Sequence, residues 1–136
     1  MIGPGVNVGE KVTVGRGVMI GTNSDIGDGS TFDWRSSVGE GVNVGESVHA
    51  GRNVIVDNGA VVDDRVTLGQ GSYIGEDVII EEDASIGSRS VICVNARVLA
   101  GLSLGQNAFV DSGVVQAIDI PDQAGPGPSL NDCTSL

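Results

Sequence analysis

The sequence predicts an all-β protein, a single continuous parallel β-helix, and three features of the chain lead to that prediction. Apolar residues recur at every sixth position, only four of the 136 residues are aromatic, and 22 are glycine. Aromatic side chains normally supply much of the buried area of a globular core. A core made mainly of valine and isoleucine therefore needs a repeating arrangement, and a fixed sequence period is typical of solenoids.

The repeat runs without an insertion through nineteen successive apolar positions. The residue that follows is glycine at twelve of them and acidic at five more, and a small or branched residue lies four residues after each. This regularity indicates one architecture throughout the repeats. The apolar positions are Ile2, Val8, Val14, Ile20, Ile26, Phe32, Val38, Val44, Ala50, Val56, Val62, Leu68, Ile74, Ile80, Ile86, Ile92, Val98, Leu104 and Val110.

Each hexad is expected to form a short strand followed by a glycine-rich turn at a corner. Two side chains that lie two residues apart, such as those of Val18 and Ile20, point inward together because strand residues alternate between faces. Three hexads then complete a triangular coil, and about six coils stacked at roughly 4.8 Å form a prism on the order of 30 Å long. Phe32 precedes the small Ala50 by one coil, and this pairing suits native packing density.

The repeats predict a β-helix over residues 1–120 and an irregular Gly/Pro/Ser-rich tail over 121–136. The chain has no run of eighteen apolar residues and no basic, apolar leader, so we expect a cytoplasmic protein that does not enter a membrane. Cys93 lies in the repeats and Cys133 in the tail. They do not form a disulfide framework and have no partners at metal-ligand spacing, so we expect no cysteine chemistry.

Charge and histidine content exclude two classes of function. Lysine and arginine number 7 against 18 acidic residues, and the net charge of −11 repels phosphates, so we expect no nucleic-acid binding. His49 is the only histidine. Catalytic zinc needs three protein ligands, so we expect no metal site.

The repeat pattern resembles the bacterial hexapeptide-transferase family of left-handed β-helices over residues 1 to about 124. The end of the last coil resembles the terminal coil of acetyl-CoA-dependent sugar acetyltransferases at Asp119, Ile120, Pro121 and Ala124, whereas Ile118 replaces the family's lysine. The resemblance implies left-handed triangular coils, acetyl-CoA as cofactor and a homotrimer with active sites between neighbouring prisms.

The sequence around His49 is similar to a stretch of sialic-acid and bacillosamine-type acetyltransferases. In that family the corresponding histidine helps to hold the acetyl group, and a second histidine nine residues earlier is the base. Glu40 occupies that earlier position here, so the resemblance implies His49 and Glu40 as the catalytic pair. The alternative is that His49 is only a solvent-facing polar residue, since Thr31 and Thr67 occupy the same row.

Two further residues are candidates for substrate binding. Asn53 falls on the substrate-orienting element of UDP-aminosugar N-acetyltransferases, which the stretch RNVIVDNGAVVDD resembles. Trp34 lies one coil after Arg16 and one coil before Arg52, so we expect the two guanidinium groups to sandwich the indole. This arrangement is either a stabilising contact or a stacking platform for a sugar or a base.

The phosphates of coenzyme A require cations near the C-terminal coils. Arg89 and Arg97 are the arginines available there, and they are the predicted cofactor-binding residues.

An apolar row on the outside of one face predicts a subunit interface. Five of its members are apolar or aromatic, and the alternative is that the tail covers the row. These five are Met19, Ile55, Tyr73, Val91 and Phe109.

Acidic residues form an edge at one corner, where like charges repel at one strand spacing. Screening by any salt is expected to stabilise the fold, whereas a specific calcium site is the alternative. The edge consists of Glu10, Asp28, Glu46, Asp64 and Glu82.

These features together predict a trimeric acetyltransferase that acts on a sugar or another small acceptor. The competing hypothesis is a non-catalytic scaffold or assembly domain, because the helix lacks an extended active-site loop and the family's catalytic residues are only partly present.

Overall fold

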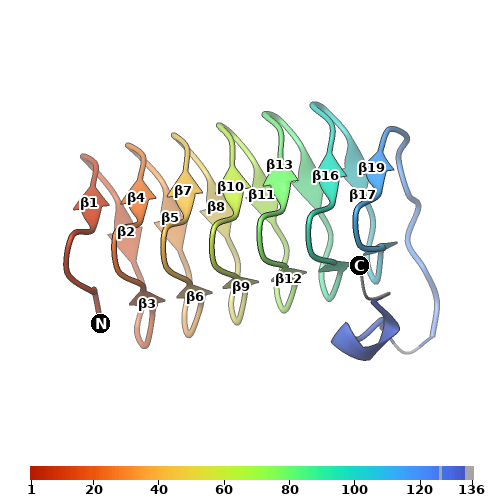
Figure 1. Cartoon of the computed structure of the whole chain (residues 1–136), viewed down its shortest axis with the longest axis horizontal. Helices are drawn as coiled ribbons and strands as arrows, with labels where there is room; N and C mark the ends of the chain where they lie inside the picture. Colours follow the sequence, from red (N-terminus) through yellow and green to blue (C-terminus); the bar gives the residue numbers. More distant parts are fainter. Residues whose placement is uncertain (126, 134–136) are drawn as a thin grey trace.

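The computed structural model describes residues 1–125 and 127–133, and it contains three parallel sheets that form the faces of a triangular prism (Figure 1). The first face consists of β1 (Asn7–Val8), β4 (Asp25–Ile26), β7 (Asn43–Val44), β10 (Val61–Val62), β13 (Ile79–Ile80), β16 (Arg97–Val98) and β19 (Val115–Gln116). The second consists of β2 (Thr13–Val14), β5 (Thr31–Phe32), β8 (His49–Ala50), β11 (Thr67–Leu68), β14 (Ser85–Ile86) and β17 (Ser103–Leu104). The third consists of β3 (Met19–Ile20), β6 (Ser37–Val38), β9 (Ile55–Val56), β12 (Tyr73–Ile74), β15 (Val91–Ile92) and β18 (Phe109–Val110).

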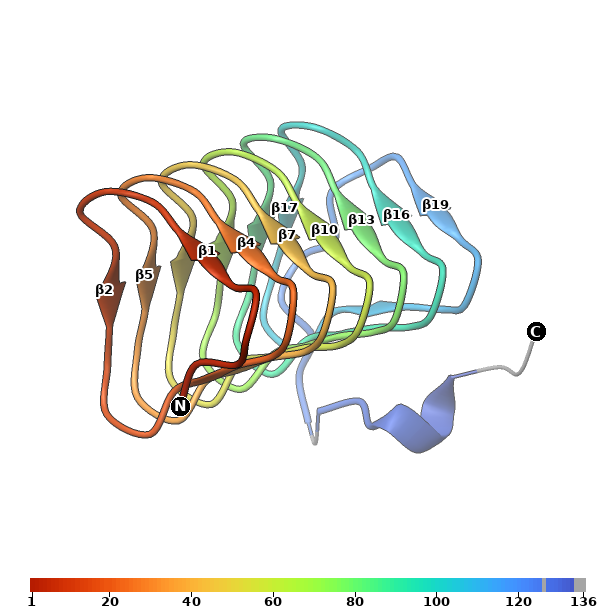
Figure 2. The ribbon, with the colours of Figure 1, turned by 60° about the vertical axis from the view of Figure 1, so that its left-hand side comes forward.

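Each strand pairs in parallel with the strand one coil later, so the coil has 18 residues as predicted. Thr31, for example, lies opposite His49, which in turn lies opposite Thr67. Figure 2 shows that the chain turns counterclockwise as it recedes from the N-terminal end, so the β-helix is left-handed. The fold class is therefore confirmed.

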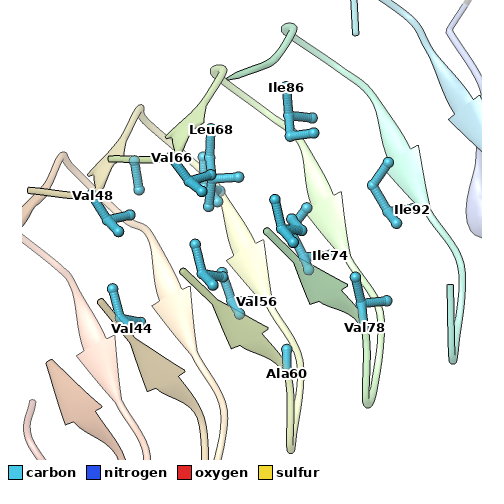
Figure 3. Packing of buried hydrophobic residues seen from close by; sticks show 14 of the residues in the cluster. Val44, Val48, Val56, Ala60, Val66, Leu68, Ile74, Val78, Ile86 and Ile92 are labelled. Carbon is cyan, nitrogen blue, oxygen red and sulfur yellow. The ribbon is translucent and has the colours of Figure 1, made fainter. Parts of the chain in front are cut away.

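The interior is a continuous column of aliphatic side chains from all three faces, seen around Val56, Leu68 and Ile74 in Figure 3. Phe32 lies opposite Ala50, and both are fully buried, which confirms their compensating sizes. Buried Ser24 and Ser30 donate hydrogen bonds to the carbonyl oxygens of Gly39 and Gly45, so the polar members of the inward row are also satisfied.

The recurring glycine after each inward residue has a different role from the one we predicted. A Cβ on Gly21 would lie 2.6 Å from the carbonyl carbon of Gly39, so glycine permits adjacent coils to stack closely. The residues with positive φ lie two positions later, and they include Arg35, with φ of 61°, and Asn53, with φ of 58°. The corner conformation is thus carried by glycine and also by residues with side chains.

The tail folds back along the last coils (Figure 1) and includes a 3₁₀-helix, η1 (Leu130–Asp132). A disulfide joins Cys93 to Cys133. The prediction that the cysteines take no part in cysteine chemistry is therefore wrong. Forty residues separate the two cysteines, and only the return of the tail brings them together.

No helix in the described part of the chain is long and apolar enough to cross a membrane. The cytoplasmic location stays a prediction, and the disulfide weighs against it, since such bonds persist mainly in oxidising surroundings.

Candidate functional site

The three corners of the prism differ strongly in charge. The corner between the first and second faces carries Glu10, Asp28, Glu46, Asp64, Glu82 and Asp83, and we call it the acidic corner. At the corner between the second and third faces, the two turn residues of each coil include no acid and together carry four of the six arginines, and we call it the arginine corner. Its turn residues are Arg16–Gly17, Trp34–Arg35, Arg52–Asn53, Gln70–Gly71, Ser88–Arg89 and Gln106–Asn107. Asp33 directly precedes Trp34 at this corner, and its carboxylate accepts the backbone N–H of Trp34 at 2.7 Å.

Trp34 and Arg52 are in contact at the arginine corner. The guanidinium carbon of Arg52 lies 4.8 Å from the centre of the indole ring, which confirms one half of the expected sandwich. Within the described residues no matching contact is found for Arg16, so that half of the prediction is wrong. Trp34 is still 49% exposed, and a cavity of about 230 Å³ opens beside it. The cavity is lined by Trp34, Arg35, Arg52, Asn53 and Gln70.

Asn53 also lines this cavity, and its backbone has a conformation that suits asparagine. Its φ of 58° is left-handed, a region that asparagine tolerates better than most residues. Its N–H donates to the carbonyl oxygen of Trp34 at 3.0 Å. The fold therefore brings the two predicted substrate-binding residues together.

His49 lies on the second face, three residues before Arg52. Its side chain points outward between Thr31 and Thr67 and is exposed. No hydrogen bond or ion pair engages its imidazole among the described residues, so both ring nitrogens are accessible to a ligand. His49 thus lies midway across the second face, between Glu46 of the acidic corner and Arg52 of the arginine corner, in a row whose neighbouring members are threonines.

Glu40 lies at the third corner, between the third and first faces. Its N–H donates to the side-chain oxygen of Asn58 at 2.9 Å, and it borders a cavity of about 310 Å³ together with Met19 and Thr22. Nine residues are half a coil, so Glu40 and His49 are on opposite sides of the prism. One chain does not bring the predicted catalytic pair together.

Arg89 and Arg97 are also separated. Arg89 lies at the arginine corner and donates to the side-chain oxygen of Asn107 at 3.3 Å. Arg97 extends from the first face, where it donates to a carboxylate oxygen of Glu81 at 2.6 Å. Because Arg89 and Arg97 project from different sides of the prism, one prism cannot present both of them to the same ligand.

The largest of the cavities described here, about 660 Å³, lies between the tail and the last coils. Sequence reasoning missed it because the path of the tail is not encoded in the repeat, although the pairing of Cys93 with Cys133 would have located it. It is lined by Asn107, Phe109, Ile120, Gln123, Gly127, Pro128 and Asp132.

The apolar row on the third face is partly covered. Val91 is only 6% exposed and Phe109 lines the cavity under the tail, whereas Met19 and Ile55 are open to solvent. The hydroxyl of Tyr73 donates to a carboxylate oxygen of Asp57 at 2.6 Å. Burial raises the pKa of Tyr73 most, and the hydrogen bond to Asp57 raises it further. The tail therefore lies against the end of the row at Phe109, and the subunit interface over the exposed part of the row stays a prediction.

Within residues 1–125 and 127–133, no group of three His, Cys, Asp or Glu side chains is placed to bind a metal ion.

The family described as the hexapeptide repeat of succinyl-transferase matches residues 37–64 and 77–115. This chain is a hexapeptide-repeat protein. No curated protein sequence matches it significantly.

Solved structures of sugar acetyltransferases share the fold of this hexapeptide-repeat protein. The acetyltransferase domain of PglB from Neisseria gonorrhoeae superposes with a TM-score of 0.72 at 19% identity, over 79% of this chain and 54% of that chain. PerB from Caulobacter crescentus, in complex with CoA and GDP-perosamine, gives 0.70 at 25% identity, over 90% and 52%. The UDP-N-acetylglucosamine O-acyltransferase LpxA from Moraxella catarrhalis gives 0.64 at 13% identity, over 82% and 55%. The chain spans about half the length of each.

Proposed function

We propose that this hexapeptide-repeat protein transfers an acetyl group from acetyl-CoA to an amine or hydroxyl of a small sugar acceptor. The observation that carries the proposal is the position of His49, the chain's one histidine, on the face that leads into the cavity of Trp34, Arg52 and Asn53. The similarity in fold to sugar acetyltransferases supports it.

The exposed imidazole of His49 suits acyl transfer because it has no competing partner in the described chain. A ring nitrogen of the imidazole can accept a proton from an attacking amine or hydroxyl, and a ring N–H can donate a hydrogen bond to the acetyl oxygen. Thr31 and Thr67, on either side, offer hydroxyl groups to the same ligand.

Glu40 takes part in the same reaction only if it comes from a second subunit, since it lies across the prism from His49. A ring of three prisms, each contributing a different face to the contact, has the required head-to-tail geometry. The exposed side chains of Met19 and Ile55, together with half-buried Tyr73, would form this interface, while Val91 and Phe109 belong to the tail contact.

We place the aliphatic arm of the cofactor in the cavity under the tail, whose lining includes Asp132 and no basic residue. Phe109, Ile120 and Pro128 offer apolar contacts for a long aliphatic arm, and Arg89 reaches its edge by bonding to Asn107. Coenzyme A supplies the acyl group as an activated thioester. His49 lies three strand spacings from Ser103, about 14 Å along the same face, so an extended arm would run along the arginine corner toward it. Arg97 stays a candidate only for contact with a neighbouring subunit's cofactor.

Incubation with acetyl-CoA and a panel of amino sugars and neutral sugars tests the proposal through release of free thiol. His49→Ala is expected to lower the rate by about 10²–10⁴-fold, the usual contribution of a proton-transferring side chain. Thr13→Ala, in the same outward row but two coils away from His49, is the matched control and should retain most activity.

Wild-type protein that neither binds acetyl-CoA nor releases thiol with any acceptor would favour the non-catalytic scaffold instead. Activity that survives in His49→Ala would remove His49 from the mechanism.

A further inference from the structure

The four arginines at the arginine corner belong to no ion pair within the described chain, and two of them, Arg35 and Arg52, line the cavity beside Trp34. The ion pairs within the described chain join Arg65 to Glu82 and Asp83, and Arg97 to Glu81. Arg35 and Arg52 belong to none of them, although acidic residues outnumber basic ones by 18 to 7.

The contact of Arg52 with Trp34 leaves its hydrogen-bond donors available. A guanidinium stacked on an indole is held in place through its flat face, while its N–H groups remain in the plane and point away from the ring. Arg35 projects from the neighbouring turn and lines the same cavity, so two guanidinium side chains border one space. Such planar donor pairs are suited to carboxylate or phosphate oxygens.

The remaining lining residues point to the rest of the ligand. Trp34 keeps half of its surface exposed, and aromatic rings pack against the apolar face of a sugar ring as they do against other apolar groups. The side-chain amides of Asn53 and Gln70 each offer a donor and an acceptor, which suits hydroxyl groups. The cavity of about 230 Å³ is smaller than the roughly 300–1,000 Å³ of sites for drug-sized ligands, so it has room for one sugar rather than a nucleotide.

We propose that the arginine corner binds an anionic monosaccharide, with its carboxylate or phosphate on Arg35 and Arg52 and its ring against Trp34. The proposal deepens the proposed function by naming the class of acceptor, and it rests on that function only for the ligand's role as acceptor. Binding itself requires neither acetyl-CoA nor turnover.

Trp34 is the single tryptophan of the chain, so its fluorescence reports on this site directly. Wild-type protein at low salt is titrated with glucuronate, glucose 6-phosphate and neutral glucose, and calorimetry provides a second measurement. We expect a saturable change with both anionic sugars and none with glucose at equal concentration. Competition by acetate and by inorganic phosphate then distinguishes a carboxylate ligand from a phosphate ligand.

Arg35→Gln and Arg52→Gln should each weaken binding of the anionic sugars about tenfold or more. Lys11→Gln is the matched control, because it removes the same charge from an exposed position at the acidic corner, and it should bind as the wild type does. Circular dichroism checks that each variant is folded. Equal binding of glucose, an absence of binding, or an equal loss in Lys11→Gln would overturn the proposal.

The result also separates this site from the proposed enzyme activity. Binding that depends on Arg35 and Arg52 without any thiol release would leave the site intact and refute the acetyltransferase. Thiol release with neutral sugars, at a rate that neither substitution changes, would support the acetyltransferase and overturn the anionic-sugar site.

Discussion

Tyr73 illustrates how one side chain on the apolar row combines packing with a polar contact. Its ring lies on the third face, and its hydroxyl donates to Asp57, which directly follows β9 in the preceding coil. The row is therefore not a uniformly apolar surface, and any subunit packed on it must accommodate this hydrogen-bonded pair.

Replacement of Tyr73 by phenylalanine should lower the free energy of unfolding by about 1 kcal/mol at neutral pH, the usual net worth of a hydrogen bond. Because the folded state raises the pKa of Tyr73, this stabilisation is fully present below the unfolded value of about 10 and is lost as pH rises above it. Denaturant unfolding at pH 7 and at pH 11 measures both effects.

The difference between Tyr73→Phe and wild type should shrink at the alkaline pH. Asp57→Asn, which keeps an acceptor oxygen, serves as the control and should destabilise less. An unchanged difference at both pH values would show that the hydroxyl contributes nothing through this bond.

At the scale of elements, the tail is held to the β-helix by a few specific contacts rather than by a regular strand. Ile120 forms a bridge with Leu104, Asn107 donates to the carbonyl oxygen of Gln123, and a disulfide joins Cys133 to Cys93. The disulfide is therefore expected to control whether the tail stays over Val91.

Reduction of this disulfide should lower the free energy of unfolding by about 1–3 kcal/mol. The loop-entropy model gives roughly 4 kcal/mol for a separation of 40 residues, and the released tail recovers part of this by gaining freedom in the folded state. Hydrogen exchange should also speed up in residues 127–133. Thermal melts and exchange with and without reductant measure these changes.

Cys133→Ser should match the reduced wild type and should not respond to reductant. A tail whose exchange rates are the same in both redox states would show that the other contacts hold it without the disulfide.

At the scale of the whole molecule, charge is segregated between two corners of the prism. The structure moderates the repulsion expected along the acidic corner, because carboxylates of Asp28 and Asp64 accept backbone N–H groups of the preceding coil at 2.8 Å. Arg65 pairs with Glu82 and Asp83, and its hydrogen bond lowers the pKa of Asp83. The contribution of Asp83 is thus present above its unfolded pKa and is lost as pH falls through the lower folded value.

Potassium chloride should raise the melting temperature between 0.05 and 2 M, because shorter Debye lengths reduce the remaining repulsion. Sodium chloride should act equally. Millimolar calcium at low salt is the comparison, and a large shift from calcium alone would favour a specific ion site instead.

A melting temperature that does not depend on potassium chloride would refute the repulsive corner. Such a result would mean that the backbone hydrogen bonds and Arg65 already neutralise the edge.

The sequence by itself determined the coil length, the strand positions, the inward side chains and the pairing of Phe32 with Ala50. It could do so because each repeat contacts only its neighbours at a fixed separation, so sequence spacing converts directly into position. The same regularity predicted that Arg52 contacts the indole of Trp34.

Only the tertiary structure decided the features that depend on contacts outside the repeat. The return of the tail joined Cys93 to Cys133, covered Val91 and created the large cavity, and no period in the sequence encodes that path. The structure also placed Glu40 across the prism from His49. The sequence motif shared with relatives gives no indication of this separation within one chain. Arginines without acidic partners became visible only after the paired ones were known, because an ion pair depends on side-chain distance rather than on composition.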